Sequence, residues 1–457
     1  MAYLDRENTI AGPGFNRWLI PPAALAVHLS IGQVYAFSVF KIPLTRVLGI
    51  DKSTDADWTQ PELAWIFSLA IVFLGLSAGV FGRWVERNGP RKTMCVAACC
   101  FGGGFLVSAL GIYLHQLWII YLGYGVLGGC GLGLGYISPV STLVKWFPDR
   151  PGMATGMAIM GFGGGAFIGA NLNLVLMDAF KSPVSTGIVQ TFIILGLLYF
   201  CFMQFGAFSV RVPAADWKPE GYVAPTSTHA MITTANVALS QAIRTPQFRF
   251  LLAVLCLNVT AGISLLEQAS PMIQEMFPMD GLHGVSVAAA GGFVALLSLF
   301  NMAGRFLWSS LSDYTGRKTI YTIYMLFGAV LYCLIPLAGH SGSPLFFVAI
   351  CAIILSMYGG VFSTIPAYLR DLFGAMHVGA IHGRLLVAWT MAAILGPMLV
   401  NYTRVYLKAR GATDVGLYAP TMYLMAGLLV IGLICNLLVR PVDERYHYKE
   451  SISEEDL

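Results

Sequence analysis

Long apolar runs alternate with short polar connections along the whole chain. Twelve of these runs are about 20 residues long or longer, which is the length that an α-helix needs to cross a bilayer. The pattern therefore predicts an all-α membrane protein with twelve transmembrane helices. We expect spans at 17–40, 61–82, 92–113, 117–141, 152–178, 186–209, 247–273, 285–311, 318–339, 344–369, 377–401 and 417–440.

The longest interior polar stretch, 210–246, separates six spans from six. It predicts an N-terminal six-helix half over 1–209, a cytoplasmic linker over 210–246, a C-terminal six-helix half over 247–440 and a cytoplasmic tail over 441–457. Within the linker we expect a short surface helix from Thr234 to Ile243. The acidic tail ends in "ISEEDL", which matches the end of a common epitope tag, so this end is native or an engineered scar.

Composition supports a membrane protein and excludes several other classes. Hydrophobic residues make up 57% of the 457 residues and charged residues 11%, whereas a soluble domain carries about 25% charged residues. The net charge of +4 is spread over loops, which argues against a nucleic-acid partner. All nine cysteines lie in apolar runs without metal-ligand spacing, so we expect no metal and no cofactor.

The distribution of lysine and arginine predicts the orientation of the chain. With both termini in the cytoplasm, the cytoplasmic segments hold 19 of these residues and the outer segments hold 7. Positive residues concentrate in cytoplasmic loops of membrane proteins. We therefore expect a multi-pass protein of the plasma membrane, or of the inner membrane if bacterial, with both ends inside.

A short loop pattern occurs at equivalent places in the two halves. "GRWVERNGPRK" (82–92) follows the second span, and "SSLSDYTGRK" (309–318) follows the eighth. This pattern resembles the loop signature of the major facilitator superfamily, G-x-x-x-D-x-x-G-x-[RK]-[RK]. In both copies an acid and basic residues can lock a tight turn between two helices. The residues concerned are Glu86, Arg87 and Arg91 in the first copy, and Asp313 and Arg317 in the second.

Longer motifs resemble a narrower family. "GQVYAFSVF" (32–40), "KWFPDRPGMATG" (145–156), "NMAGRFLWSSLSDYTGRK" (301–318) and "HGRLLVAWTMAAILGP" (382–397) are similar to the oxalate/formate antiporter family, which is related to the monocarboxylate transporters. The resemblance implies the major facilitator fold and transport of small carboxylates such as oxalate, formate, lactate or pyruvate. Animal relatives carry an aspartate where this chain has Asn301, and oxalate-exchanging relatives carry a lysine where it has Trp389.

Arg305 lies inside the eighth span. Ser298, Asn301, Arg305, Ser309 and Ser312 are spaced by three or four residues, so they form one polar stripe on the helix. The residues alone leave two interpretations open: the guanidinium binds an anion, or it snorkels to the membrane surface. The resemblance, whose members use this arginine for the substrate carboxylate, favours anion binding, with Asn301 beside it.

Aromatic residues at similar depth are candidates for the wall of a binding chamber. His28 and Tyr35 share a face of the first span, Tyr358 and Phe362 share a face of the tenth, and Tyr136 lies in the fourth. Each alone is ordinary membrane packing. As a set they can surround a guanidinium with a dry environment that strengthens its attraction for a carboxylate.

Three titratable side chains are candidates for proton coupling. His382 shares a face of the eleventh span with Trp389, and Glu267 lies late in the seventh span. The ordinary pKa of histidine, about 6.5, suits a proton gradient across the plasma membrane. We expect His382 or Glu267 to contribute, with His28 as a third candidate; Glu267 is alternatively a polar gate residue.

These observations predict a secondary transporter of small monocarboxylates that works as a monomer in the lipid bilayer, by proton symport. The alternatives are an oxalate/formate-type anion exchanger, a drug exporter, a membrane sensor and an intramembrane enzyme. No metalloprotease or serine-hydrolase motif occurs in the spans, so an enzyme is not expected.

Overall fold

The structure is a computed structural model that describes residues 2–214, 217–222, 231–233, 235–279 and 284–448. Twelve helical segments in this part of the chain are long and apolar enough to cross a membrane. The predicted all-α fold with twelve transmembrane helices is therefore confirmed. The chain divides into two compact units, one built mainly from residues 1–224 with 375–387, and one from 225–374 with 388–452.

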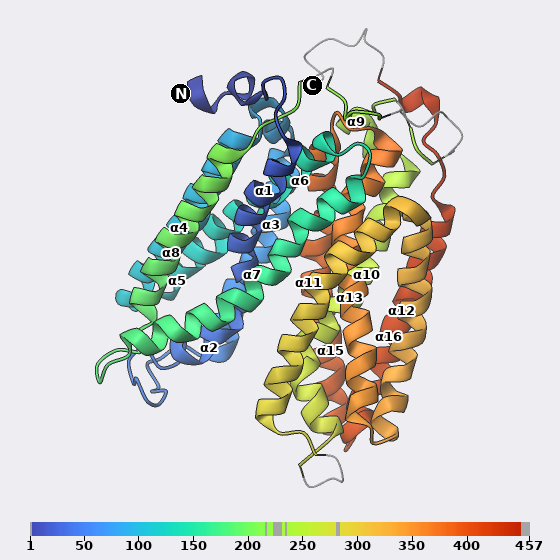
Figure 1. The fold of residues 1–457 in the computed structure, drawn as a ribbon. Coiled ribbons are helices and arrows are strands. Elements are labelled where there is room, and N and C mark those ends of the chain that lie inside the picture. The colour runs from blue at the N-terminus through green and yellow to red at the C-terminus, as the bar shows by residue number, and fades with distance from the viewer. Residues whose placement is uncertain (1, 215–216, 223–230, 234, 280–283, 449–457) are drawn as a thin grey trace. The chain divides into compact units, whose positions relative to one another are not determined.

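The first unit contains six of the spans. In Figure 1 its helices α4 and α8 run side by side, and they are in extensive contact. A short helix from the eleventh span, α14 (Val378–Leu385), packs on α3 in the same unit. The spans of this unit are α1 with α2 (Ile20–Ile31, Ser38–Leu44), α3 (Gln60–Asn88), α4 (Pro90–Tyr113), α5 with α6 (Leu117–Ile120, Gly129–Trp146), α7 (Pro151–Phe180) and α8 (Ile188–Ser209).

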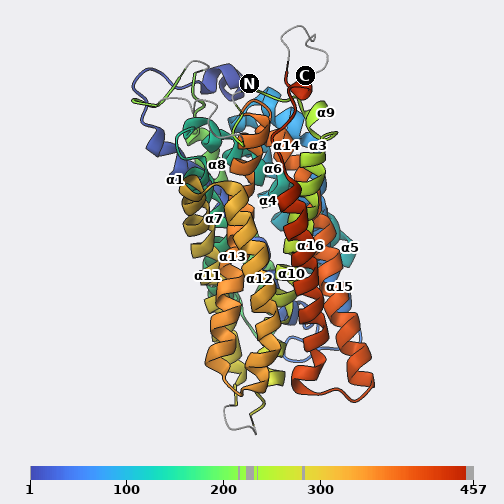
Figure 2. The ribbon, with the colours of Figure 1, turned by 90° about the vertical axis from the view of Figure 1, so that its right-hand side faces the viewer.

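The second unit contains the remaining spans. Helix α11 packs along α13, and α12 packs along α16, as Figure 2 shows. The spans of this unit are α10 (Pro246–Met276), α11 (Val287–Thr315), α12 (Arg317–His340), α13 (Pro344–Phe373), α15 (Val387–Ala409) and α16 (Ala419–Leu438).

The repeated loop pattern corresponds to a repeated backbone conformation. Gly89 ends α3 and precedes α4 with φ +82°, and Gly316 ends α11 and precedes α12 with φ +85°. Residues with a Cβ rarely adopt positive φ. The same tight turn therefore joins two long helices at matching positions of the two halves.

Two spans depart from a continuous α-helix. The first span changes to a 3₁₀ turn over Gly32–Phe37 before α2 begins. The fourth span contains a wider π-helical stretch over Tyr121–Gly128. A 3₁₀ stretch within a helix often marks a functional hinge, and π-helical stretches are frequent at functional sites; here the 3₁₀ stretch contains Tyr35.

The helix expected from Thr234 to Ile243 is wrong in its extent. The structure has only one turn there, α9 (Leu239–Ala242), and Thr234 lies outside the described residues. Instead, Val237 donates its backbone N–H to the carbonyl of Phe373 at 2.9 Å and forms a bridge with His447. These contacts hold the start of the segment extended. The "ISEEDL" end of the tail also lies outside the described residues.

Candidate functional site

Arg305 lies fully buried on α11. Its Nε donates a hydrogen bond to Oδ1 of Asn301, one helical turn earlier, at 2.9 Å. Its Cζ lies 5.6 Å from the centre of the Phe362 ring. The side chain thus turns inward along the predicted polar stripe, and in this arrangement it does not snorkel. A guanidinium at such a depth costs about 2.5–3.5 kcal/mol by insertion scales.

The backbone around Arg305 is fixed by close packing of α11 on α13. A Cβ at Gly304 would lie 2.0 Å from the carbonyl oxygen of Ser356, and a Cβ at Gly359 would lie 2.2 Å from that of Asn301. The carbonyl oxygen of Arg305 accepts hydrogen bonds from the hydroxyls of Ser363 (2.6 Å) and Ser309 (2.5 Å). These contacts hold the base of the arginine side chain in a defined place.

Aromatic side chains form a wall beside the guanidinium. Phe362 packs against Trp389 with ring centres 4.4 Å apart and meets Tyr358 edge-on at 5.3 Å. All three side chains are buried. The C-terminal unit therefore brings together five of the candidate binding residues, Arg305, Asn301, Tyr358, Phe362 and Trp389. We call these five residues the arginine cluster.

The N-terminal unit contains a second cluster around His28. The ring of His28 stacks on Tyr136 with centres 5.2 Å apart, and Tyr136 lies 5.9 Å from His382. Tyr35 reaches the same cluster through Phe162, whose ring contacts those of Tyr35 (5.0 Å) and Tyr136 (5.7 Å). His28, Tyr35 and Tyr136 are thus brought together with His382 in one group of the N-terminal unit, in which Tyr35 is half-buried.

The two histidines of this group differ in their hydrogen bonding. Nδ1 of His28 lies 2.8 Å from the carbonyl oxygen of Ala158, and Nε2 lies 3.2 Å from that of Tyr136. His382 is 1% exposed, and neither of its ring nitrogens has a hydrogen-bond partner within the described part of the chain. Buried polar atoms normally have partners, so His382 is available to a ligand or to water.

Glu267 belongs to a different neighbourhood from the arginine cluster. Asn401 on α15 donates a hydrogen bond to Oε1 of Glu267 at 3.3 Å, and Gln268 donates one to Oδ1 of Asn401 at 3.0 Å. These bonds tie α10 to α15. The geometry suits the alternative interpretation of Glu267 as a polar gate residue.

An ion pair two turns further along α10 was not predicted. Glu275 is bound through both carboxylate oxygens by Arg404 of α15, and it also accepts a hydrogen bond from the Tyr418 hydroxyl at 2.6 Å. The sequence contained one signal for it, because opposite charges lie at the same end of the seventh and eleventh spans.

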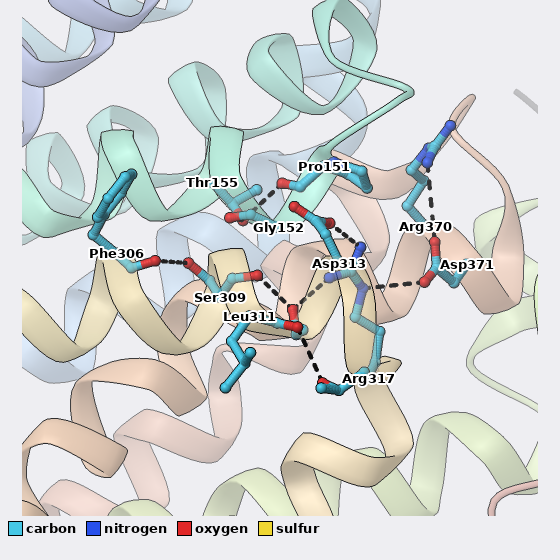
Figure 3. A network of polar contacts seen from close by, with 12 residues as sticks. Pro151, Gly152, Thr155, Phe306, Ser309, Leu311, Asp313, Arg317, Arg370 and Asp371 are labelled. Atoms are coloured by element: carbon cyan, nitrogen blue, oxygen red, sulfur yellow. Dashed lines mark hydrogen bonds and ion pairs between the residues drawn. The ribbon is translucent and has the colours of Figure 1, made fainter. Parts of the chain in front are cut away.

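The two copies of the loop motif use their charges differently. In the second copy Arg317 contacts Asp313 at 2.5 Å and Asp371 of α13 at 3.2 Å, as Figure 3 shows, and it also bonds Ser312. Here the acid and the basic residue lock the turn as predicted. The side chains of Arg317 and Asp313 are each 6% exposed.

In the first copy the expected lock within the motif is wrong. Glu86 pairs with Lys145 of α6 at 2.7 Å and accepts a hydrogen bond from the backbone N–H of Gly379 at 3.1 Å. Arg91 is buried and donates to the carbonyl of Tyr3 at 2.8 Å, whereas Arg87 is exposed. The acid therefore holds neighbouring helices instead of its own turn.

The motif "KWFPDRPGMATG" fixes the start of the first span. Arg17 binds both carboxylate oxygens of Asp149 (2.6 and 2.9 Å), and its Cζ lies 4.6 Å from the Phe147 ring. Burial raises the pKa of Asp149, but the hydrogen bonds from Arg17 outweigh this and hold the pKa below its ordinary value. Its contribution to stability is therefore present at neutral pH and is lost as the pH falls.

Membrane-length helices in two halves with a repeated glycine turn define a multi-pass membrane transporter. The family description Major Facilitator Superfamily matches residues 15–397 and 282–455. The chain therefore belongs to the major facilitator superfamily, and the resemblance of its repeated loop pattern to that superfamily is confirmed.

Similar proteins include transporters from bacteria. The chain is 26% identical over 383 residues to the uncharacterized MFS-type transporter YhjX of Escherichia coli strain K12, covering 83% of this chain and 86% of that protein. It is 24% identical over 386 residues to the oxalate:formate antiporter of Oxalobacter formigenes, covering 83% of each. Its fold resembles the Escherichia coli fucose:proton symporter FucP, with a TM-score of 0.66 and 13% identity over 92% of this chain and 99% of that one.

Proposed function

We propose that the protein is a secondary active transporter of small monocarboxylates, of the lactate, pyruvate or formate type, in the plasma membrane. The observation that carries this proposal is the fully buried Arg305, which donates a hydrogen bond to Asn301 and whose guanidinium lies over the Phe362 ring. The planar guanidinium matches a carboxylate with two parallel hydrogen bonds. Binding of a substrate anion would explain why the chain buries the charge of Arg305 at a cost in free energy.

The charge of the arginine cluster favours monoanions over dianions. The cluster contains one cationic residue, Arg305, and a buried Trp389 occupies the position where oxalate-exchanging relatives carry a lysine. A second carboxylate of oxalate would lose its hydration without gaining a fixed cation from these five residues. We therefore propose lactate-sized monoanions as the substrates, with anion exchange of the oxalate/formate type as the alternative.

Uptake by the purified protein in proteoliposomes tests this proposal. Wild-type protein is expected to take up radiolabelled lactate and pyruvate, and unlabelled monocarboxylates are expected to compete better than oxalate. In the Trp389→Lys variant, oxalate is expected to compete more strongly. Tighter competition by oxalate than by lactate in the wild type would contradict the charge argument, and no uptake of any carboxylate would contradict the function.

We further propose that uptake is coupled to protons through the histidines of the N-terminal unit. A neutral imidazole donates from one nitrogen only, whereas a protonated ring donates from both. Because both nitrogens of His28 lie against carbonyl oxygens, taking up a proton allows the ring to donate to both. His382, whose ring nitrogens lack hydrogen-bond partners among the described residues, is the other histidine candidate.

Comparison of counterflow with net uptake identifies the coupling residue. His28→Gln and His382→Gln are both expected to retain lactate exchange. Accumulation of lactate under an inward proton gradient is expected to be reduced only in the variant that lacks the proton-binding histidine. Glu267→Gln is expected to behave as the wild type, because its carboxylate lies among the amides of α10 and α15. Wild-type protein that exchanges but never accumulates lactate under an inward proton gradient would show an obligate antiporter.

A further inference from the structure

We propose that Gly262 of α10 determines the size of the carboxylate that the protein accepts, because it sets the position of the Tyr358 ring. This inference rests on the proposed function, which makes Tyr358 part of the wall of the carboxylate site. It adds a specificity-determining residue on a helix that contributes none of the five members of the arginine cluster.

Gly262 lies directly against the face of the Tyr358 ring. A Cβ at position 262 would lie 2.1 Å from Cδ2, 2.7 Å from Cε2 and 2.8 Å from Cγ of Tyr358. A Cβ atom essentially never lies within 3.0 Å of another non-bonded heavy atom, so a side chain at position 262 requires the ring to shift. The ring of a buried tyrosine moves as a rigid body, and its displacement is passed to its neighbours.

The displaced ring would move within the arginine cluster. Tyr358 meets Phe362 edge-on at 5.3 Å, and Phe362 lies under the guanidinium of Arg305 at 5.6 Å. The next residue, Gly359, would place a Cβ 3.1 Å from Cγ of Arg305. Tyr358 is therefore one aromatic ring away from the guanidinium, and its helix α13 packs directly against the stem of the arginine side chain on α11.

The other surroundings of Tyr358 leave its ring some room. Gly262 and Tyr358 both line a small pocket, together with Asn258 of α10 and Tyr324 and Tyr332 of α12. The Tyr332 hydroxyl is buried and has no hydrogen-bond partner among the described residues. The absence of a side chain at position 262 is therefore what lets the ring lie against α10.

The expected consequence is selectivity by size. Formate carries only a hydrogen beside its carboxylate, whereas lactate and pyruvate carry two further carbon atoms. In the Gly262→Ala variant the ring is pushed off α10 and the space beside Arg305 shrinks. We expect the KM for lactate and pyruvate to rise about tenfold, the usual effect of one methylene-sized misfit, while the KM for formate changes little.

The experiment measures KM for formate, lactate and pyruvate in proteoliposomes of the wild type and three variants. Gly427→Ala is the matched control, since a Cβ at that position of α16 meets no atom within 4 Å; its KM values are expected to equal those of the wild type. In Gly262→Ala with Tyr358→Leu, the smaller leucine is expected to restore lactate and pyruvate uptake.

The outcomes separate the two proposals. Absence of carboxylate uptake by the wild type would overturn the proposed function and the size inference with it. Normal wild-type uptake with an unchanged ratio of lactate to formate KM in Gly262→Ala would overturn the size inference alone. If Gly262→Ala does not fold, Tyr358→Leu in the wild-type background decides: it is expected to admit larger 2-oxo acids, and an unchanged size limit would overturn the inference.

Discussion

The Arg305→Ala variant is expected to lose carboxylate uptake by about 100-fold or more. Removing one partner of a buried charge-assisted pair costs about 2–5 kcal/mol, and Arg305 is fully buried in its helix. Arg305→Lys is also expected to be strongly impaired, because an ammonium group offers a point charge instead of two parallel donors. Uptake of lactate and pyruvate in proteoliposomes measures both effects.

The matched control for this experiment is Arg384→Ala. Arg384 is exposed, at the end of α14 in the eleventh span, so its replacement is expected to leave uptake near the wild-type value. Size-exclusion profiles of the three variants show whether each protein is folded. A well-folded Arg305→Ala protein with near-normal uptake would exclude the arginine as the anion-binding residue.

The Arg317→Ala variant is expected to be strongly destabilised. It leaves the carboxylates of Asp313 and Asp371 buried without the cation that contacts both of them (Figure 3). Breaking a buried ion pair by removing one partner costs about 3–5 kcal/mol. The midpoint of thermal unfolding of the purified protein in detergent is therefore expected to fall by several degrees.

An exposed ion pair of the same chain provides the comparison. The side chains of Arg445 and Asp443 are 70% and 60% exposed, and surface pairs contribute about 0–1 kcal/mol. Arg445→Ala is expected to unfold at the wild-type temperature. Equal midpoints for Arg317→Ala and Arg445→Ala would mean that the network in Figure 3 does not stabilise the fold.

The fold could be predicted from the sequence because membrane spans are long and uniform. Every expected span has a counterpart, including the one that contains Arg305. The ends differ by several residues: the eleventh span reaches Ala409 instead of 401, since helices continue through polar residues beyond the apolar core. The prediction of a helix over 234–243 was wrong because Val237 bonds to Phe373 and His447, and these contacts override the local helix propensity.

The candidate site was predictable only as far as helical spacing holds. Spacing along α11 correctly placed Asn301 beside Arg305. In the first span the 3₁₀ turn over Gly32–Phe37 advances about 120° per residue instead of 100°. Tyr35 is thereby rotated by about 60° relative to His28, which no periodicity of a regular helix reveals.

Contacts between helices could not be predicted from the sequence. The approach of Gly262 to Tyr358 and the pairing of Arg404 with Glu275 depend on which helices are neighbours. A glycine in an apolar span indicates only that something approaches closely, and not which side chain does so. For the same reason, the sequence predicted that Glu86 stabilises its own turn, and it could not show that Glu86 pairs with Lys145 of α6.

The tight seam between α11 and α13 has a mechanical consequence. Gly304 and Gly359 leave no space between the two helices, and Ser363 of α13 holds the carbonyl of Arg305. Sliding or rotating either helix alone would force backbone atoms into each other. During a transport cycle the two helices must therefore travel as one rigid body, and the guanidinium moves with that body instead of swinging on its own.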